Sequence, residues 1–333
     1  MAPPQTHWVI VALETLFCPL PNLTLPAPHT CEFRTYERTR PDQVAERIRD
    51  ADIIIMTILP LTAEILSTEV SRQLKMVSVI ASGTDAVDLA ACRARGIVVG
   101  NTPHCNVTTV TEHVLALYFS TRRSIILTNS LTRAGDWVTK GSQQSTMDGL
   151  DGKPPRTARE ELVGIIGYGA IGRNIEAKAK ILGMKTVVAG RKGVPAPEGR
   201  VPFETVIREC SVLIVCLPRS PETLNLISEA EFHQMKPYSL LINVSRGGIV
   251  DEKALISALK ERRIAGAGTD VYSQEPAEPG NNVLLTPDTA ELNLVTTPHL
   301  AWYADETLDN YSRTCGENIA EFVTIGRPKH QVC

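Results

Sequence analysis

Short apolar runs and amphipathic segments alternate along the first hundred residues of the chain. Four runs have the length and the Val and Ile content of buried parallel strands, and they lie at 8–13, 52–58, 76–82 and 97–99. Segments 42–49 and 87–94 instead place apolar residues at helical spacing. This βαβ alternation predicts a doubly wound α/β domain, interrupted by a proline-rich loop over 18–28.

A second series of elements follows from about residue 102. Helical spacing runs from 107 to about 131, and a polar stretch rich in Gly and Ser at 135–159 is predicted to be a loop or excursion. We interpret that stretch as a tolerated insertion rather than a lid or a dimer contact. Further strands are predicted at 162–166, 185–189, 212–217, 240–244, 264–268 and 294–297.

One glycine-rich segment, from Gly164 to Gly172, stands between a predicted strand and a predicted helix. Gly167 allows the tight turn, and Gly169 lets a pyrophosphate approach the main chain. Ala170, Ile171 and Gly172 begin the helix, whose first N–H groups would bind the phosphate. Because a strand precedes the motif and a helix follows it, the segment predicts a dinucleotide site rather than a plain glycine loop.

The residues after the next strand indicate which dinucleotide binds. An NAD site usually carries Asp or Glu here, to accept hydrogen bonds from the ribose hydroxyls. This chain has Arg191 and Lys192 instead. An Arg can donate two charge-assisted hydrogen bonds to the 2′-phosphate of NADP, so we expect NADP(H) to be preferred. The alternative is a solvated basic turn in an enzyme that binds NAD(H).

These elements predict two domains, each with a doubly wound parallel sheet. Residues 102–297 would form a Rossmann nucleotide-binding domain. Residues 1–101 and 298–333 would form a discontinuous, flavodoxin-like substrate domain, because 298–333 is mostly helical and too short to fold alone. We expect the cofactor to bind between the two domains.

Composition and charge narrow the class of protein. The 333 residues are 43% hydrophobic and carry a formal net charge of -3, which provides no basic field for nucleic acid or an anionic membrane. No stretch is long and apolar enough to span a bilayer, so the cytoplasm is the expected location. The eight cysteines lack the spacing of zinc sites, so we expect reduced thiols and no metal.

Three segments after predicted strands carry side chains suited to hydride-transfer chemistry. Arg246 lies in Asn243-Val244-Ser245-Arg246-Gly247-Gly248, Glu275 ends the run that begins at Thr269-Asp270, and His299 lies in Thr297-Pro298-His299. An Arg at the carboxyl end of a parallel strand is placed at the ligand crevice. Together with the glycine motif, Ser82-Gly83-Thr84-Asp85 and Thr111-Glu112-His113, these segments resemble the D-isomer-specific 2-hydroxyacid dehydrogenases, in particular the NADP-type glyoxylate/hydroxypyruvate reductases.

The resemblance implies a role for each matching residue. Arg246 would hold the substrate carboxylate and polarise the 2-keto oxygen, and His299 would protonate that oxygen. Glu275 would orient His299 and raise its pKa. The remaining residues implied to contact substrate or cofactor are the backbone N–H groups of Ser82 and Gly83, Thr111, Asp270, and the adenosine-pocket segment that includes Pro218, Arg219 and Thr223.

One departure from the usual family pattern keeps a second class of function open. Trp302 stands where many members have Gly, and it would place an indole wall at the substrate. A Trp here resembles the hydroxypyruvate and glycerate dehydrogenases, but also the C-terminal-binding-protein corepressors. The leading interpretation is a homodimeric reductase that converts a 2-keto acid to the D-2-hydroxy acid, and the alternative is a corepressor-like, nucleotide-sensing protein with little catalysis. The arrangement of Arg246, Glu275 and His299 favours the enzyme.

Overall fold

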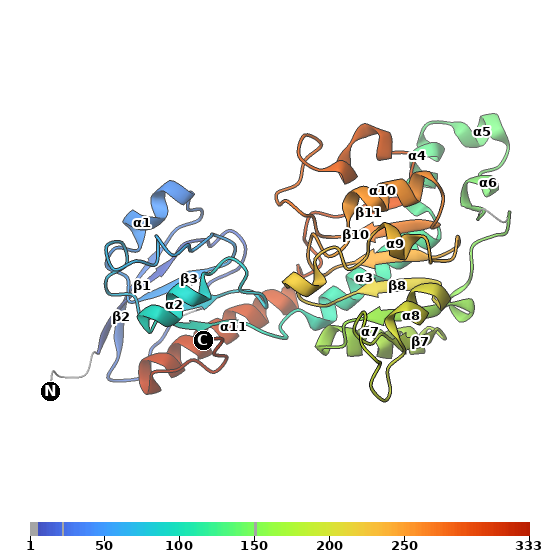
Figure 1. Ribbon diagram of the computed structural model, residues 1–333. Coiled ribbons are helices and arrows are strands. Elements are labelled where there is room, and N and C mark those ends of the chain that lie inside the picture. The colour runs from blue at the N-terminus through green and yellow to red at the C-terminus, as the bar shows by residue number, and fades with distance from the viewer. Residues whose placement is uncertain (1–5, 22, 150–151) are drawn as a thin grey trace. The chain divides into compact units, whose positions relative to one another are not determined.

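The structure is a computed structural model that describes residues 6–21, 23–149 and 152–333 (Figure 1). The chain divides into two compact units, which we call the first unit (Met1–Asn106 and Tyr303–Cys333) and the second unit (Val107–Trp302). The expected boundaries before 102 and 298 lie five residues earlier than these divisions. His299 and Trp302 therefore belong to the second unit.

The first unit is built on a five-stranded parallel sheet in the order β2-β1-β3-β4-β5. Its strands are β1 (His7–Ala12), β2 (Thr30–Thr35), β3 (Ile53–Met56), β4 (Met76–Val79) and β5 (Val98–Gly100). This is the flavodoxin-like strand order, whose topological switch point falls between β1 and β3. The predicted fold class is confirmed for this unit. The sequence analysis missed β2, an edge strand that is only partly buried and contains few large apolar residues.

The helices of the first unit are η1 (Pro41–Gln43), α1 (Val44–Arg47), α2 (Leu89–Arg95) and α11 (Asp305–Ile325). The expected helix over 42–49 is thus a 3-10 turn followed by one short α-helix. The C-terminal helix α11, red in Figure 1, packs against β4 of this unit. Its buried face includes Tyr311, Cys315 and Ile319, which is why the segment after 303 belongs to this unit although it is distant in sequence.

The second unit contains a six-stranded parallel sheet in the order β11-β10-β9-β8-β6-β7. Its strands are β6 (Leu162–Ile166), β7 (Lys185–Val188), β8 (Val212–Val215), β9 (Leu240–Asn243), β10 (Gly266–Thr269) and β11 (Leu294–Thr296). Outside β7, Val201 forms an isolated parallel bridge with Ala189. If this bridge is counted as the third strand, the order becomes the Rossmann order 3-2-1-4-5-6 continued by one more strand, as predicted.

Helices flank this sheet, and they differ from the prediction between 107 and 160. The expected single helix is divided into α3 (Val107–Arg122) and α4 (Ile125–Arg133), because Ser124 between them has a φ of 45°. The expected loop contains α5 (Asp136–Lys140), α6 (Gln144–Met147) and η2 (Ala158–Glu160). The other helices are α7 (Ala170–Ile181), α8 (Phe203–Glu209), η3 (Pro221–Thr223), α9 (Glu229–Phe232), α10 (Glu252–Lys260), η4 (Val283–Leu285) and η5 (Pro287–Thr289).

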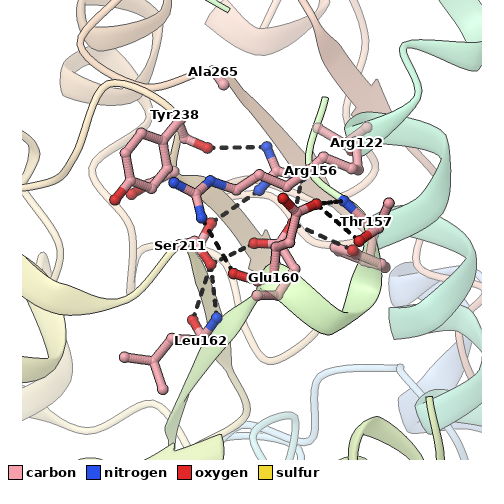
Figure 2. A network of polar contacts seen from close by, with 12 residues as sticks. Arg122, Arg156, Thr157, Glu160, Leu162, Ser211, Tyr238 and Ala265 are labelled. Carbon is pink, nitrogen blue, oxygen red and sulfur yellow. Dashed lines mark hydrogen bonds and ion pairs between the residues drawn. The ribbon is translucent and has the colours of Figure 1, made fainter. Parts of the chain in front are cut away.

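A buried ion pair lies at the amino ends of strands in the second unit's sheet (Figure 2). Arg122, at the end of α3, lies 2.7 Å from Glu161 through Nε and Oε1, and their side chains are 5% and 0% exposed. The guanidinium also donates to the carbonyls of Tyr238 at 3.0 Å and Ser211 at 3.2 Å. Glu161 accepts hydrogen bonds from the hydroxyls of Ser211 and Tyr118. Both charges therefore lie among buried polar partners, which lowers the cost of burying them.

This network connects three neighbouring strands where they begin. Glu161 precedes β6, Ser211 precedes β8, and Tyr238 lies shortly before β9. The hydroxyl of Ser211 also accepts the N–H of Leu162 at 2.9 Å. We call this set of residues, Arg122, Glu161 and Ser211, the amino-edge clamp. Residues at the amino ends of these strands therefore stabilise the sheet. The clamp does not involve the carboxyl ends of the strands.

Candidate active site

The three residues expected to carry the chemistry follow three adjacent strands of the second unit. Arg246 comes after β9, Glu275 after β10 and His299 after β11. Carboxyl ends of neighbouring parallel strands lie at one edge of the sheet, so the three loops meet there. The pair Glu275 and His299 is in direct contact in the structure.

His299 and Glu275 form a hydrogen-bonded pair at this edge. Nδ1 of His299 lies 2.6 Å from Oε2 of Glu275. Because an ionised carboxylate only accepts hydrogen bonds, Nδ1 carries a proton and Nε2 is the nitrogen left for another partner. The side chains are 39% and 33% exposed, so the ring remains accessible. Glu275 is held in turn by the backbone N–H of Tyr272, which donates to Oε1 at 3.0 Å.

The environment of Glu275 favours its ionised form. Burial raises the pKa of this carboxyl, but the hydrogen bond and charge of His299 lower it, and the N–H of Tyr272 and the charge of Arg246 lower it further. The net result is a Glu275 pKa below its ordinary value. Glu275 therefore remains a carboxylate, able to orient the ring and balance a positive charge on it, throughout the neutral range.

The backbone of His299 is held in a left-handed conformation with a φ of 55°. Such a conformation costs a residue with a Cβ about 1–3 kcal/mol and persists only where the surroundings enforce it. Here the N–H of His299 donates to the carbonyl of Asp270 at 2.9 Å. The indole N–H of Trp302 donates to the carbonyl of His299 at 2.8 Å. Sequence reasoning assigned Trp302 only to the substrate wall, and the structure shows that it also braces the histidine.

Asp270 anchors the loop that carries His299. Its carboxylate is 1% exposed and accepts the hydroxyl of Thr297 at 2.6 Å and the N–H groups of Leu300 at 3.0 Å and Ala301 at 2.8 Å. The expectation that it contacts a nicotinamide carboxamide stays a prediction. These hydrogen bonds show that Asp270 also holds the backbone of the segment that contains His299, the candidate catalytic histidine.

His113 belongs to the same network, and sequence reasoning gave it no role. Its Nε2 lies 2.9 Å from the Thr297 hydroxyl and 3.6 Å from Oδ1 of Asp270. Because the Thr297 proton is donated to Asp270, Nε2 of His113 must be the donor to Thr297. The Thr-Glu-His sequence at the start of α3 was recognised only as a family motif. Its partner Thr297 is 184 residues away in the sequence, so no local signal could identify the contact.

Arg246 is half-buried, and its Nη1 donates to the carbonyl of Ser245 at 2.8 Å. The glycine after it is required by packing. A Cβ on Gly247 would lie only 1.7 Å from the carbonyl oxygen of Tyr272. The turn that carries Arg246 therefore lies directly against the segment that carries Glu275, which fixes the relative positions of the two side chains.

The glycine motif has the geometry that a dinucleotide pyrophosphate requires. Gly167 has a φ of +100°, and a Cβ there would lie 2.5 Å from the carbonyl oxygen of Cys216. Around Gly169, in contrast, no other atom of the chain lies within 4 Å of an added Cβ. The protein leaves this approach open at the N-terminus of α7, where Ala170, Ile171 and Gly172 form the first turn and no side chain caps the helix. These residues fit the pyrophosphate of a dinucleotide.

The two basic residues after β7 occupy different environments. Lys192 reaches back to the buried carboxylate of Glu231, with Nζ 2.8 Å from Oε1, and also donates to the carbonyl of Leu226 at 3.2 Å. Arg191 is exposed. The structure therefore gives Lys192 a structural partner, and it leaves Arg191 as the better candidate for a phosphate.

The expected adenosine-pocket residues form a turn after β8. Thr223 receives the N–H of Ser220 at 2.7 Å and donates to the carbonyl of Pro218 at 3.0 Å, while Arg219 is exposed. Thr111, the other expected cofactor contact, is fully buried, and its hydroxyl donates to the Val107 carbonyl at 2.8 Å. The hydroxyl proton of Thr111 is thus already committed within α3.

Ser82 and Gly83 follow β4 in the first unit. Among the described residues, none accepts a hydrogen bond from their backbone N–H groups. The Ser82 carbonyl is bonded to the amide of Asn101 at 2.7 Å, which fixes this turn. The two N–H groups are therefore available to an acceptor such as a carboxylate.

Other site types receive no support from the described part of the chain. No group of three His, Cys, Asp or Glu side chains gathers there in a way that could hold a metal ion. All eight cysteines are free thiols. None of the described helices is long and apolar enough to cross a membrane.

The fold and the site together define a two-unit α/β oxidoreductase with a dinucleotide motif. A family model described as D-isomer specific 2-hydroxyacid dehydrogenase, NAD binding domain, matches residues 115–301. The chain is 38% identical over 306 residues to glycerate dehydrogenase of Methylorubrum extorquens, with 92% of each chain covered. It is 32% identical over 290 residues to glyoxylate reductase of Pyrococcus furiosus, covering 84% of this chain and 82% of that one.

A solved structure gives the same result. The fold matches that of the NADPH-dependent glyoxylate/hydroxypyruvate reductase of Sinorhizobium meliloti with a TM-score of 0.76 and 26% identity, over 98% of this chain and 97% of that one. The chain therefore belongs to the D-isomer-specific 2-hydroxyacid dehydrogenase family, and it is an NAD(P)-dependent enzyme of that family. The prediction of an enzyme is confirmed.

Proposed function

We propose that this enzyme reduces a 2-keto acid to the D-2-hydroxy acid, with His299 as proton donor, Glu275 as its orienting partner and Arg246 as the ligand of the substrate carboxylate. The observation that carries the proposal is the 2.6 Å contact between Nδ1 of His299 and Glu275. That contact fixes the tautomer and directs Nε2 away from the carboxylate. A general acid in a 2-keto acid reductase requires this arrangement.

Arg246 provides a fixed positive charge, and His299 provides the proton. Arg246 is always charged, so it binds a carboxylate and polarises the adjacent keto oxygen at every physiological pH. His299 holds a proton on Nε2 and delivers it to the oxygen that becomes the hydroxyl. Glu275 balances the charge of the imidazolium before this transfer. Gly167, Gly169 and the start of α7 would hold a reduced nicotinamide cofactor, which would supply the hydride.

NADPH is the cofactor that Arg191 favours. An exposed guanidinium stands where NAD sites usually carry an acid, and it can donate two hydrogen bonds to a 2′-phosphate. The Sinorhizobium meliloti protein with the same fold is described as NADPH-dependent, which supports the proposal. Because Lys192 is paired with Glu231, the proposed preference for NADPH depends on Arg191. Arg219, in the turn after β8, is a second exposed cation.

We also propose a homodimer, although not through the apolar side chains of α3. Val114 and Leu117 of α3 are 0% and 2% exposed, so they belong to the core of the second unit. Large apolar side chains are exposed instead on α4 and α5, namely Ile125, Ile126, Trp137 and Val138. A second copy of the chain would cover this surface. Light scattering should give a dimer for the wild type and a monomer for Trp137→Glu; a dimeric variant would contradict this interface.

The function is tested by steady-state kinetics with a panel of 2-keto acids. Glyoxylate, hydroxypyruvate, 4-methyl-2-oxopentanoate and phenylpyruvate would each be assayed with NADPH and with NADH. We expect reduction of at least one acid, a D product on chiral analysis, and a higher kcat/KM with NADPH. If no acid is reduced with either cofactor, the proposed reaction is wrong; if NADH gives the higher kcat/KM, only the cofactor preference is wrong.

A further inference from the structure

His299 lies in a loop rather than in a regular element, and this loop begins at the end of β11. Its backbone is tied to the segment that follows β10. The Tyr272 hydroxyl donates to the Thr297 carbonyl at 3.0 Å, and the Asp270 carboxylate accepts the two N–H groups that come after His299. These contacts join one loop to another, and loops are less rigid than the helices and strands that they connect. The position of the His299 ring therefore depends on what else holds this loop.

His113 connects the loop to a long helix of the same unit. It lies in the second turn of α3, which packs against β9, β10 and β11 through a buried face that includes Val114 and Leu117. Nε2 of His113 lies 2.9 Å from the Thr297 hydroxyl, and this hydroxyl donates to Oδ1 of Asp270 at 2.6 Å. The loop that contains His299 is thereby hydrogen-bonded to a helix whose own position is fixed by core packing.

The direction of these two hydrogen bonds follows from the chemistry of the three groups. The Asp270 carboxylate, with its side chain 1% exposed, accepts the one proton of the Thr297 hydroxyl. Only lone pairs of that hydroxyl are then left, so His113 must donate from Nε2. A side chain at position 113 with no donor at this point would leave the hydroxyl without that partner. The chain of hydrogen bonds from α3 to the buried carboxylate would then be interrupted.

This chain of hydrogen bonds ends on the residue that fixes the backbone of His299. The Asp270 carbonyl accepts the N–H of His299 at 2.9 Å, and the Asp270 carboxylate holds the next two N–H groups. His299 itself has a φ of 55°, a conformation that persists only where the surroundings enforce it. A shift of Asp270 would therefore move the imidazole relative to Glu275. Displacements of about 1 Å are enough to lower an enzymatic rate by up to about 10²-fold.

We propose that His113 is a positioning residue, which acts through Thr297 and Asp270 to hold the His299 ring in the orientation that proton transfer requires. The inference rests on the proposed function, since it concerns the proton donor of the same site. His113 acts by donating a hydrogen bond from Nε2 and exchanges no proton with the substrate. A neutral side chain that donates from the same place should therefore replace it, and removal of the Thr297 hydroxyl should have the same effect as removal of His113.

The kinetic test compares two substitutions of similar length, assayed with the same panel of 2-keto acids and NADPH. His113→Met removes the donor and should lower kcat about tenfold, with KM for the acid changed by less than about twofold. His113→Gln keeps an N–H donor and should retain kcat within about threefold. Thr297→Val should match His113→Met, and the double variant should be worse than either single variant by less than about twofold. His233→Met, at an exposed histidine of the second unit, is the matched control and should change nothing.

Nuclear magnetic resonance measures the same geometry without turnover. In protein with ¹⁵N-labelled imidazoles, the proton between Nδ1 of His299 and Glu275 should give a downfield signal that His299→Gln removes. His113→Met should shift or broaden this signal, whereas His113→Gln should preserve it. Should His113→Met fail to fold, Thr297→Val decides by the same signal.

The outcomes separate the inference from the proposed reaction. An unchanged His299 signal in His113→Met, equal losses in the Met and Gln variants, or full additivity with Thr297→Val would each overturn the inference. A kcat of His113→Met within about twofold of an active wild type would overturn it as well, and the proposed reaction would stand. If the wild type reduces no 2-keto acid, the proposed reaction is wrong, and the His299 signal still shows whether His113 positions the ring.

Discussion

An arginine–glutamate ion pair and a hydrogen-bonded histidine–glutamate pair lie at the two edges of one sheet, and they differ in burial and in the groups that surround them. Arg122 and Glu161 form the ion pair of the amino-edge clamp in the second unit, with side chains 5% and 0% exposed. His299 and Glu275 lie at the carboxyl edge with side chains 39% and 33% exposed. The first pair is enclosed by the hydroxyls and carbonyls of neighbouring strands. In the second pair, one imidazole nitrogen is held and the other is left for a ligand.

The difference separates a pair that maintains the fold from a pair that we propose takes part in the reaction. A buried ion pair cannot exchange a proton without leaving a charge in the interior. A half-exposed pair costs less to rearrange, and it contributes little to stability. The contrast therefore predicts that substitutions at the amino edge change the free energy of unfolding, whereas substitutions at the carboxyl edge change the rate.

The largest expected effect is on stability at the amino edge. Glu161→Ala should lower the free energy of unfolding by about 3–5 kcal/mol, because it leaves the Arg122 guanidinium buried without its anion. Urea unfolding of the purified protein measures this loss. Glu160→Ala is the matched control, because the neighbouring Glu160 only caps an exposed turn at Thr157 and its loss should cost much less stability. Equal losses for the two variants would contradict the distinction between the edges.

The next effect is on the rate at the carboxyl edge. His299→Ala should lower kcat by about 10²-fold or more, as the loss of a general acid does, while the free energy of unfolding changes by less than about 1 kcal/mol. His233→Ala, an exposed histidine on the same unit, should leave kcat unchanged. An unaffected rate in His299→Ala would remove this residue from the reaction and leave its pairing with Glu275 structural.

The same contrast applies to the neighbouring cations Arg191 and Lys192. Arg191→Ala should lower kcat/KM with NADPH about tenfold or more and leave NADH nearly unchanged, since it removes charge-assisted hydrogen bonds to the 2′-phosphate. Lys192→Ala should instead lower the free energy of unfolding, because the carboxylate of Glu231 is buried and loses its cation. If Lys192→Ala reduces NADPH use as strongly as Arg191→Ala, the assignment of Lys192 to structure is wrong.

The smallest effect concerns pH and the partly exposed Glu275. Its pKa in the folded protein lies below the ordinary value of 4.5, so its contribution to stability is present above that pH and is lost as the pH falls through the folded pKa. The difference in unfolding free energy between the wild type and Glu275→Gln should therefore be constant above about pH 5 and shrink as the pH falls further. Urea unfolding across this range measures it. A difference that grows as the pH falls would mean that the Glu275 pKa is raised instead.

The parts of the site that could be predicted depend on residues that are close together in the sequence or that recur with the period of a helix or strand. The strand and helix that flank Gly167 and Gly169 follow from apolar periodicity, and the basic residue after β7 is visible as a departure from the acid of NAD sites. The missed β2 strand has little apolar content because its edge position leaves it partly exposed. The break between α3 and α4 depends on the backbone conformation of Ser124, a residue type that does not by itself end a helix.

Contacts between distant segments could not be predicted in this way. His113 meets Thr297 across 184 residues, and Trp302 was assigned to a substrate wall although its indole N–H braces the His299 carbonyl. Lys192 is adjacent to Arg191, yet only the packing of α9 places Glu231 beside it. Each of these contacts depends on which elements become neighbours in space.

The sequence by itself determined that two parallel-sheet domains form, that one binds a dinucleotide, and that Arg246, Glu275 and His299 follow three of its strands. These properties depend on periodicity, on glycines that a turn requires, and on motifs in a fixed order. Only the tertiary structure decided which side chains meet: His299 with Glu275, Arg122 with Glu161, and His113 with Thr297. The physical reason is that strand order and packing bring together residues that lie tens to hundreds of positions apart, and burial then decides whether a charged pair stabilises the fold or remains accessible to a substrate.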